Sequence, residues 1–77
     1  MLEMMMFNSK LFKYREETED TGLIYNVRYG DLLLLKGKSK ELVESLIASG
    51  TMELETNNKV VDYLLDKKIL LKQEDTL

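Results

Sequence analysis

The 77-residue sequence contains no cysteine, no histidine, no proline and no tryptophan. Without cysteine, the chain can form neither a disulfide framework nor a thiolate metal site. Without histidine, it lacks the commonest general base and the commonest transition-metal ligand, so the usual serine- and cysteine-hydrolase arrangements cannot be built. We therefore expect a protein that is not an enzyme and that uses no cofactor or metal.

A basic surplus is also missing, because 14 acidic residues face 11 basic ones and the formal net charge is −3. Nucleic-acid binders usually carry a positive excess, so this balance disfavours DNA and RNA as partners. No apolar run approaches the 18 residues of a membrane span, and Met1–Phe7 lacks the basic start and cleavage site of a signal peptide. We expect no membrane association and a cytoplasmic location.

What the chain does contain is enough apolar sequence, 44%, for one small folded domain. A chain of this length buries only about 60% of its surface on folding, so its core is thin. We expect a flexible Met-rich N-terminus over residues 1–9, because termini fray unless they are tied down. A single domain then spans residues 10–72, and a polar tail spans residues 73–77.

Three segments have the composition of strands. Residues 10–15 predict an edge strand, and residues 23–29 show the clearest alternation of apolar and polar side chains. After the turn at Gly30-Asp31, Leu32–Leu35 predicts the second arm of a hairpin, apolar on both faces. Which of these leucines points outward stays open, because a shift of one residue exchanges the two faces.

Two helices are expected after the strands. Ser39 is predicted to cap the first, whose apolar stripe is Leu42, Val43, Leu46 and Ile47 and which ends at Gly50. Residues 51–56 fit either a short strand or one helical turn. Asn57 or Asn58 should cap the second helix, with a buried stripe of Val60, Val61, Leu64 and Leu65. Strands followed by helices indicate an α+β domain with a three-stranded antiparallel sheet.

Most candidate chemical motifs have a simpler explanation. Gly37-Lys38-Ser39 resembles the end of a phosphate-binding loop, but position 32, where the upstream glycine belongs, is leucine. The acidic run at residues 16–20 lacks the alternating ligand spacing of a calcium loop. Tyr25 and Tyr29 could stack nucleobases on a strand face, although packing between elements explains aromatic residues in small domains more often.

These explanations do not account for the leucine-dense strand, Leu32–Leu35. An apolar strand beside a helix with its own apolar stripe forms a groove to which an extended peptide could add as a further strand. The rival explanation is that the leucines fill the core or bury a homodimer interface. The leucine run and the helical stripe favour these two explanations about equally.

The segment Thr21–Lys36, with its Gly22-Leu23-Ile24-Tyr25 strand, its glycine turn and its Leu-Lys ending, resembles the hairpin of PqqD-like domains, nearest to the mycofactocin-chaperone type. The pattern Val61-x-x-Leu64-Leu65 followed by Leu70-Leu71 is similar to the end of that family, with Lys68-Ile69-Leu70 where the family has a glycine. The resemblance covers residues 10–72 and rests on hydrophobic spacing. One departure is that residues 51–56 are short for the family's middle helix.

This resemblance implies a three-stranded sheet packed on a winged-helix-like helical unit. It also implies a non-catalytic adaptor for a ribosomally made, post-translationally modified peptide. The leader of the precursor peptide would add beside the third strand against the last helix, and the adaptor would present it to a modifying enzyme, often a radical-SAM protein. Mapped on this chain, the third strand is Asp31–Lys36 and the last helix is Asn58–Lys68.

The predicted peptide-binding residues come from these two segments and the turn after the strand. Lys36, Lys38 and Lys59 are expected to pair with acidic residues of the leader, and Leu33 and Leu35 to line the groove. The full predicted set is Asp31, Leu32, Leu33, Leu34, Leu35, Lys36, Lys38, Asn58, Lys59, Val61, Asp62, Leu64 and Leu65. The alternative is a small winged-helix regulatory or structural protein, including a homodimer, that acts through protein contacts or weak nucleic-acid contacts.

Overall fold

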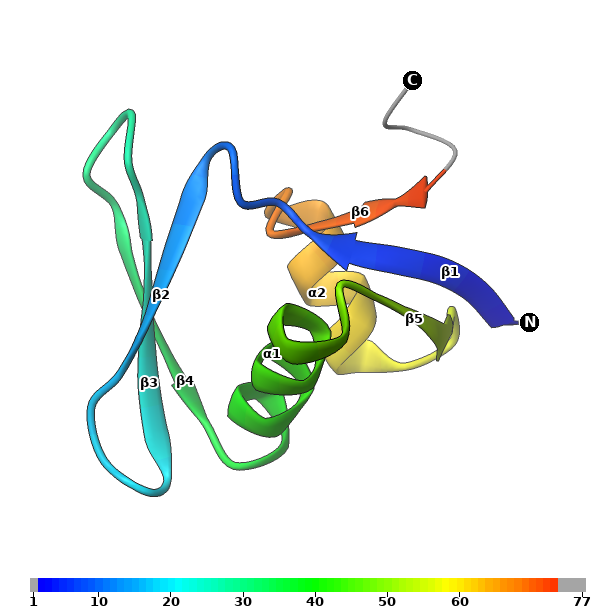
Figure 1. Cartoon of the computed structure of the whole chain (residues 1–77), viewed down its shortest axis with the longest axis horizontal. Helices are drawn as coiled ribbons and strands as arrows, with labels where there is room; N and C mark the ends of the chain where they lie inside the picture. Colours follow the sequence, from blue (N-terminus) through cyan, green and yellow to red (C-terminus); the bar gives the residue numbers. More distant parts are fainter. Residues whose placement is uncertain (1, 74–77) are drawn as a thin grey trace.

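The computed structural model describes residues 2–73 and contains two three-stranded antiparallel sheets and two helices. Sheet A has the strand order β5-β1-β6 and sheet B the order β2-β3-β4. In Figure 1, sheet B stands on the left, sheet A on the right, and the helices lie between them. The strands are β1 (Leu2–Phe7), β2 (Phe12–Glu16), β3 (Thr21–Asn26), β4 (Leu32–Lys36), β5 (Thr51–Glu55) and β6 (Leu70–Lys72), and the helices are α1 (Lys38–Ser49) and α2 (Lys59–Asp66).

The α+β class is confirmed, and the sheet predicted from residues 10–36 is sheet B. Its strand β2 is an edge strand, as expected, and β4 is the other edge. The second sheet was not predicted. Residues 51–56, left open between strand and helix, form the strand β5, which pairs with β1 rather than with sheet B. None of the helices within residues 2–73 has the length and apolarity needed to cross a membrane.

The expectation of a flexible arm over residues 1–9 is wrong for residues 2–7. These residues form β1, the central strand of sheet A, which pairs with β5 on one side and β6 on the other. Met5 is fully buried, so the Met-rich segment supplies core as well as backbone pairing. The expected polar tail, residues 73–77, lies outside the described residues from residue 74 onward.

The buried side chain of Asn8 fixes the end of β1 against the turn that follows α2. Its side-chain amide donates to the carbonyl of Lys68 at 2.9 Å, and its backbone N–H donates to the carbonyl of Ile69 at 2.8 Å. Lys68 has a positive φ of 67°, which lets the chain reverse there from α2 into β6. These bonds join segments that are 60 residues apart in the sequence.

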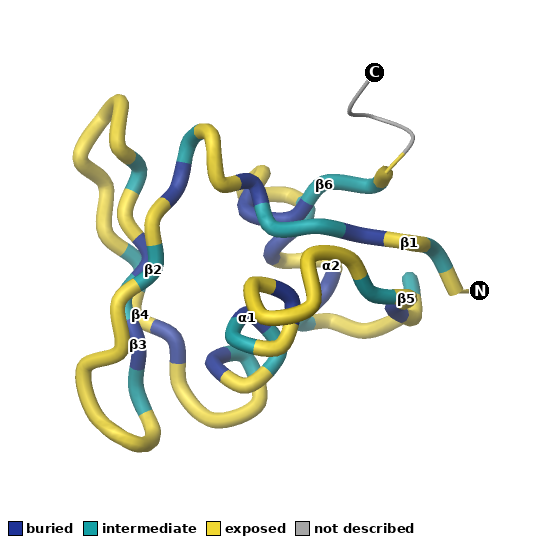
Figure 2. Tube along the Cα trace, viewed as in Figure 1, coloured by how far each residue is buried: buried dark blue, intermediate teal, exposed yellow. Residues whose placement is uncertain are grey.

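The core lies between the inner faces of the two sheets and the buried stripes of the helices, as the dark-blue segments in Figure 2 show. Val43 and Leu46 of α1 and Val61 and Leu64 of α2 are buried, which confirms half of each predicted stripe. Ile47, predicted to be buried with them, is 45% exposed. α1 contacts β1 and β5 of sheet A and β4 of sheet B, so it packs between the sheets.

Three local predictions need correction at element ends. The strand predicted over residues 23–29 stops at Asn26, because the Asn26 side chain accepts hydrogen bonds from the N–H groups of Arg28 and Tyr29 and closes a turn. Ser39 does not cap α1, which begins directly after Gly37 and has no side-chain cap. α2 ends at Asp66, so the predicted helical residues Lys67 and Lys68 lie beyond it, whereas Asn58 does cap it.

An ionic cluster around the buried Lys40 joins sheet B to α1. Lys40, only 4% exposed, lies 2.8 Å from a Glu16 carboxylate oxygen and 3.1 Å from one of Glu44. The Tyr14 hydroxyl donates to Glu44 at 2.7 Å, and the Tyr14 ring lies over Gly22, where a Cβ atom would overlap it.

Burial, reinforced by the hydrogen bond to Glu44 and its charge, raises the pKa of Tyr14 to about 12. The same hydrogen bond from Tyr14, followed by that from Lys40, lowers the pKa of Glu44.

This cluster predicts a loss of stability at alkaline pH. The folded state holds Tyr14 protonated up to about pH 12, whereas the unfolded chain releases that proton near the ordinary tyrosine pKa of 10.0. The stabilisation is therefore complete below pH 10 and falls as the pH rises towards 12, by about 1 kcal/mol after allowance for solvent screening. Urea unfolding at pH 8, 10 and 11.5 should show the stability advantage of the wild type over Tyr14→Phe shrinking across this range. A constant difference would contradict this assignment.

Candidate groove at the edge of sheet B

The four consecutive leucines of β4 divide between the two faces of sheet B. The register pairs Leu33 with Ile24 and Leu35 with Gly22, and Ile24 and Leu35 are buried in the core. Leu33 is half-buried on this inner face. Leu32 and Leu34 point outward and are 68% and 50% exposed. The structure thus answers the question that the uniform leucine run left open.

The free edge of β4 has backbone groups directed away from the sheet. Two hydrogen bonds at the ends of the β3–β4 pair show which residues of β4 bond to β3. They run from Asn26 N–H to the Asp31 carbonyl and from Gly37 N–H to the Asp20 carbonyl. Because bonding to a given neighbour alternates along an antiparallel strand, Leu33 and Leu35 bond to β3. The N–H and carbonyl groups of Leu32, Leu34 and Lys36 therefore face the edge, where no strand within residues 2–73 pairs with β4.

A hollow of about 420 Å³ lies beside this edge, between sheet B and α2. Its floor is apolar and comes from Phe12, Ile24 and Ile69, which are all buried. Asn26, Asp31 and Lys67 supply polar groups at its sides. The residues that line it are Phe12, Ile24, Asn26, Asp31, Leu32, Leu33, Tyr63, Lys67 and Ile69. The open edge and the hollow together are called the β4 groove below.

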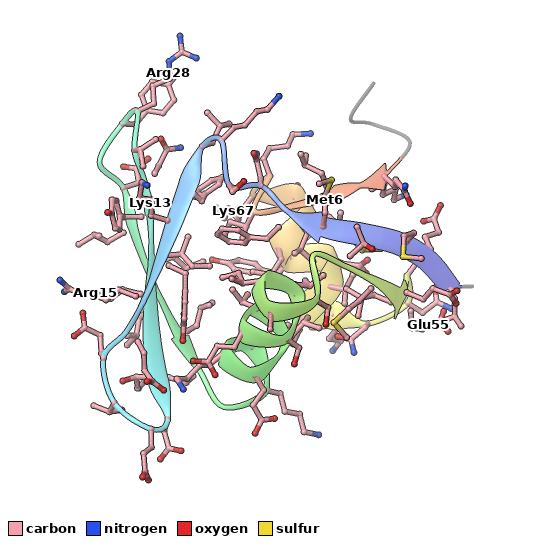
Figure 3. The ribbon with its side chains drawn as sticks, in the orientation of Figure 1. Met6, Lys13, Arg15, Arg28, Glu55 and Lys67 are labelled. Carbon is pink, nitrogen blue, oxygen red and sulfur yellow. The ribbon has the colours of Figure 1, made fainter. Side chains whose placement is uncertain are left out.

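The helical side of the β4 groove consists of Tyr63 and Lys67, which the predicted site does not include. Tyr63 is 45% exposed, and the Lys67 ammonium lies 5.8 Å from the centre of its ring. Figure 3 shows Lys67 between sheet B and the rest of the molecule. The spacing of four residues could have indicated this pair, because residues i and i+4 share one helix face. The apolar stripe of α2, on which the predicted groove lies, belongs to a different face.

The structure brings together only part of the predicted peptide-binding set. Asp31, Leu32 and Leu33 line the β4 groove, and Leu34, Leu35 and Lys36 belong to its strand. Val61 and Leu64 are 2% and 0% exposed, so they support α2 from inside the core and cannot contact a peptide at the groove. The placement of the site on the apolar stripe of α2 is therefore wrong for these two residues.

The remaining predicted residues lie in other places. Lys38 and Asn58 line a separate hollow between α1, β5 and the start of α2, to which Val61 also contributes. Asp62 and Leu65 line a third hollow, beside β6. Lys59 is exposed at the start of α2 and lines none of the three hollows. Of the three lysines expected to pair with a leader peptide, Lys36 alone stands on β4, whereas Lys67, which is outside the predicted set, lines the hollow.

The groups in the β4 groove can contact a ligand through both polar and apolar surfaces. It holds one carboxylate, one ammonium group, an amide and a phenol around an apolar floor. No cluster of three acidic side chains within residues 2–73 is placed to hold a metal ion. What the arrangement offers is a row of backbone donors and acceptors next to an apolar hollow, and an extended peptide can use both.

Tyr25 and Tyr29, considered as a stacking surface, are not a pair in the structure. Tyr25 is on the outward face of β3 and is 36% exposed, whereas Tyr29 lies in the turn after the strand and is 71% exposed. Neither packs in the core, so the expectation that they fill space between elements is wrong as well.

Searches against protein-family models, curated proteins and solved structures found no match to this chain.

Proposed function

We propose that the protein is a non-catalytic adaptor that binds an extended peptide as a fourth strand of sheet B, at the β4 groove. The observation that carries this proposal is the free edge of β4 directly beside an apolar hollow. Natural sheet proteins usually protect such edges with charges, bulges or coverage. Here the exposed edge residues are Leu32 and Leu34, with a single terminal Lys36.

The peptide's chemistry follows from the groove. Side chains of an added strand alternate between the two sheet faces, so every second side chain would enter the hollow over Phe12, Ile24 and Ile69. These positions favour apolar residues. Lys67 at the hollow and Lys36 at the end of the strand favour a carboxylate nearby. The expected ligand is therefore an extended segment with apolar residues at alternate positions and at least one acidic residue.

The resemblance to PqqD-like domains makes the ligand more specific. It implies that the peptide is the leader of a ribosomally made precursor, and that the adaptor presents it to a modifying enzyme of the radical-SAM type in the cytoplasm. Sheet B with α1 and α2 would correspond to the family's three-stranded sheet on its winged-helix-like unit. β5 would occupy the position of the middle helix of that family, and β1 and β6 would be strands that the family fold does not have.

A selection experiment tests the binding proposal and itself supplies the ligand. Twelve-residue random peptides would be selected by display against the immobilised full chain, and the enriched peptides titrated into ¹⁵N-labelled protein. We expect sequences with apolar residues at alternate positions, and shifts at Asp31–Lys36, Tyr63 and Lys67. Enrichment without alternation, or shifts confined to other elements, would count against strand addition. A gene for a short precursor beside this one would support the leader-peptide proposal, and its leader is then the peptide to titrate.

A matched pair of helix substitutions tests the helical side of the groove. Tyr63 and Ile47 are both 45% exposed, but only Tyr63 lines the β4 groove. Tyr63→Ala should weaken binding of a selected peptide about tenfold, because aromatic anchors contribute strongly to interfaces. Ile47→Ala should leave the affinity within about twofold, by isothermal titration calorimetry. Equal effects of the two substitutions would remove Tyr63 from the site.

A further inference from the structure

The outer face of sheet B is apolar at its centre and basic at its border. Leu23, Tyr25, Leu32 and Leu34 point away from the helices, and Leu32 is the most exposed of them. The other outward positions are Thr21 and three basic residues, Lys13 and Arg15 on β2 and Lys36 on β4. No acidic residue takes an outward position on these three strands. Arg15 is already paired with Glu17 at 2.6 Å, which leaves Lys13 and Lys36 without an ion pair in the described part of the chain.

The outer face of sheet A has the opposite charge around a similar centre. The β1 register places Leu2, Met4 and Met6 outward together with Leu71 of β6. Leu2 is 58% exposed and Met4 37%. The outward positions of β5 are Thr51, Glu53 and Glu55. A hydrogen bond with the chain's amino group lowers the pKa of Glu55 and offsets part of its charge, so Glu53 contributes most of the acidic character of this face. Within residues 2–73, no lysine or arginine takes an outward position on this sheet.

These two faces are complementary to each other and not to themselves. Packing two copies through sheet B alone would bring Lys13 and Lys36 of one copy towards the same cations of the other. Packing through sheet A alone would bring carboxylates together. Like charges across an interface are costly, whereas opposite charges fix its register. We propose that the outer face of sheet B of one molecule docks on the outer face of sheet A of a second copy, head to tail.

The placement of the two faces makes this association open-ended. Figure 3 shows Lys13 and Arg15 projecting on one side of the molecule, whereas Met6 and Glu55 lie on the other side. A heterologous contact of this kind leaves a free face at each end, so it builds chains or rings instead of a closed dimer. It covers sheet faces and leaves the edge of β4 open, so it stands independently of peptide binding.

The size of the faces makes the association weak. Three strands about 4.8 Å apart and five residues at about 3.4 Å each give a footprint of roughly 240 Å². That is well below the roughly 800 Å² per partner of a standard stable interface, so we expect self-association only at high micromolar to millimolar concentration.

Sedimentation analysis of the full chain and two single-face variants tests the proposal. Met4→Lys places a cation on the face that meets Lys13 and Lys36 of the second copy and so blocks sheet A, and Leu34→Glu places a carboxylate on the face that meets Glu53 and so blocks sheet B. The wild type should exceed the dimer mass as its concentration rises from about 10 μM to 2 mM. Each variant alone should stay at the monomer mass of 9.0 kDa. An equimolar mixture should form a 1:1 dimer, because each variant keeps the face that the other has lost.

Each other pattern overturns the proposal. A wild type that stays monomeric at 2 mM shows that the faces do not associate. Self-association of Met4→Lys alone indicates a symmetric contact through sheet B, and self-association of Leu34→Glu alone indicates one through sheet A. Thermal melts check that the variants are folded. If either is not, Leu2→Lys or Thr21→Glu replaces it, because Leu2 and Thr21 also point outward on the same faces.

Discussion

Replacing Leu34 with proline is expected to weaken binding of a selected peptide about thirtyfold while the domain stays folded. The N–H of residue 34 faces the open edge, so proline removes a donor to the added strand and not a bond to β3. Loss of that bond, with an unpaired carbonyl left on the peptide, costs about 2 kcal/mol. Edge strands tolerate proline where the missing N–H faces away from the sheet.

Two further substitutions serve as controls for this result. Leu34→Ala keeps the backbone donor and should bind the peptide within about threefold of the wild type. Leu33→Pro removes an N–H that bonds to β3 and should lower the stability of the domain instead. If Leu34→Pro binds the peptide as tightly as Leu34→Ala, the backbone of β4 takes no part in recognition. Calorimetric titration and urea unfolding of all three variants provide the comparison.

The second large effect is expected at the N-terminus, where Met5→Ala should destabilise the domain by about 2–5 kcal/mol. Met5 is fully buried in the central strand of sheet A, so truncation leaves a cavity in the core. A domain of this length has a total stability of about 4–12 kcal/mol, so the substitution removes between about a sixth and all of it.

The neighbouring residue provides the control. Met4 has the same side chain and is 37% exposed on the outer face of the same strand. Met4→Ala should change the free energy of unfolding by no more than about 0.5 kcal/mol. Urea unfolding of both variants measures these two changes in the free energy of unfolding. Similar, small losses would mean that residues 2–7 do not form the centre of a sheet in solution.

β1 could not be predicted because its pairing is not local. Met4, Met5 and Met6 give three consecutive apolar residues, so the alternation that indicates a half-buried strand is absent. Its partners β5 and β6 follow more than 40 residues later in the chain. The β5 segment, with clear alternation of Met52 and Leu54 among polar residues, stayed ambiguous because its partner β1 carries no strand pattern in the sequence.

The hairpin and the second helix were predictable because their signals are local. The alternation in residues 23–26, the turn at Gly30 and the Asn58 cap each act within a few residues. The direction of each leucine in β4 was not predictable, since four identical residues carry no pattern and the pairing with β3 decides it. Tyr63 and Lys67 were missed for a related reason. The apolar stripe of α2 packs against the core, and the groove faces its neighbouring side.

Amide hydrogen exchange along β4 tests the central claim most directly. The claim is that a peptide adds as a strand at this edge, so its bonds must fall on alternate residues. With a saturating selected peptide, exchange at the amides of Leu32, Leu34 and Lys36 should slow markedly. The amides of Leu33 and Leu35, which already bond to β3, should change little. Slowing that is uniform along β4, or that appears only at the edges of sheet A, would contradict strand addition at the β4 groove.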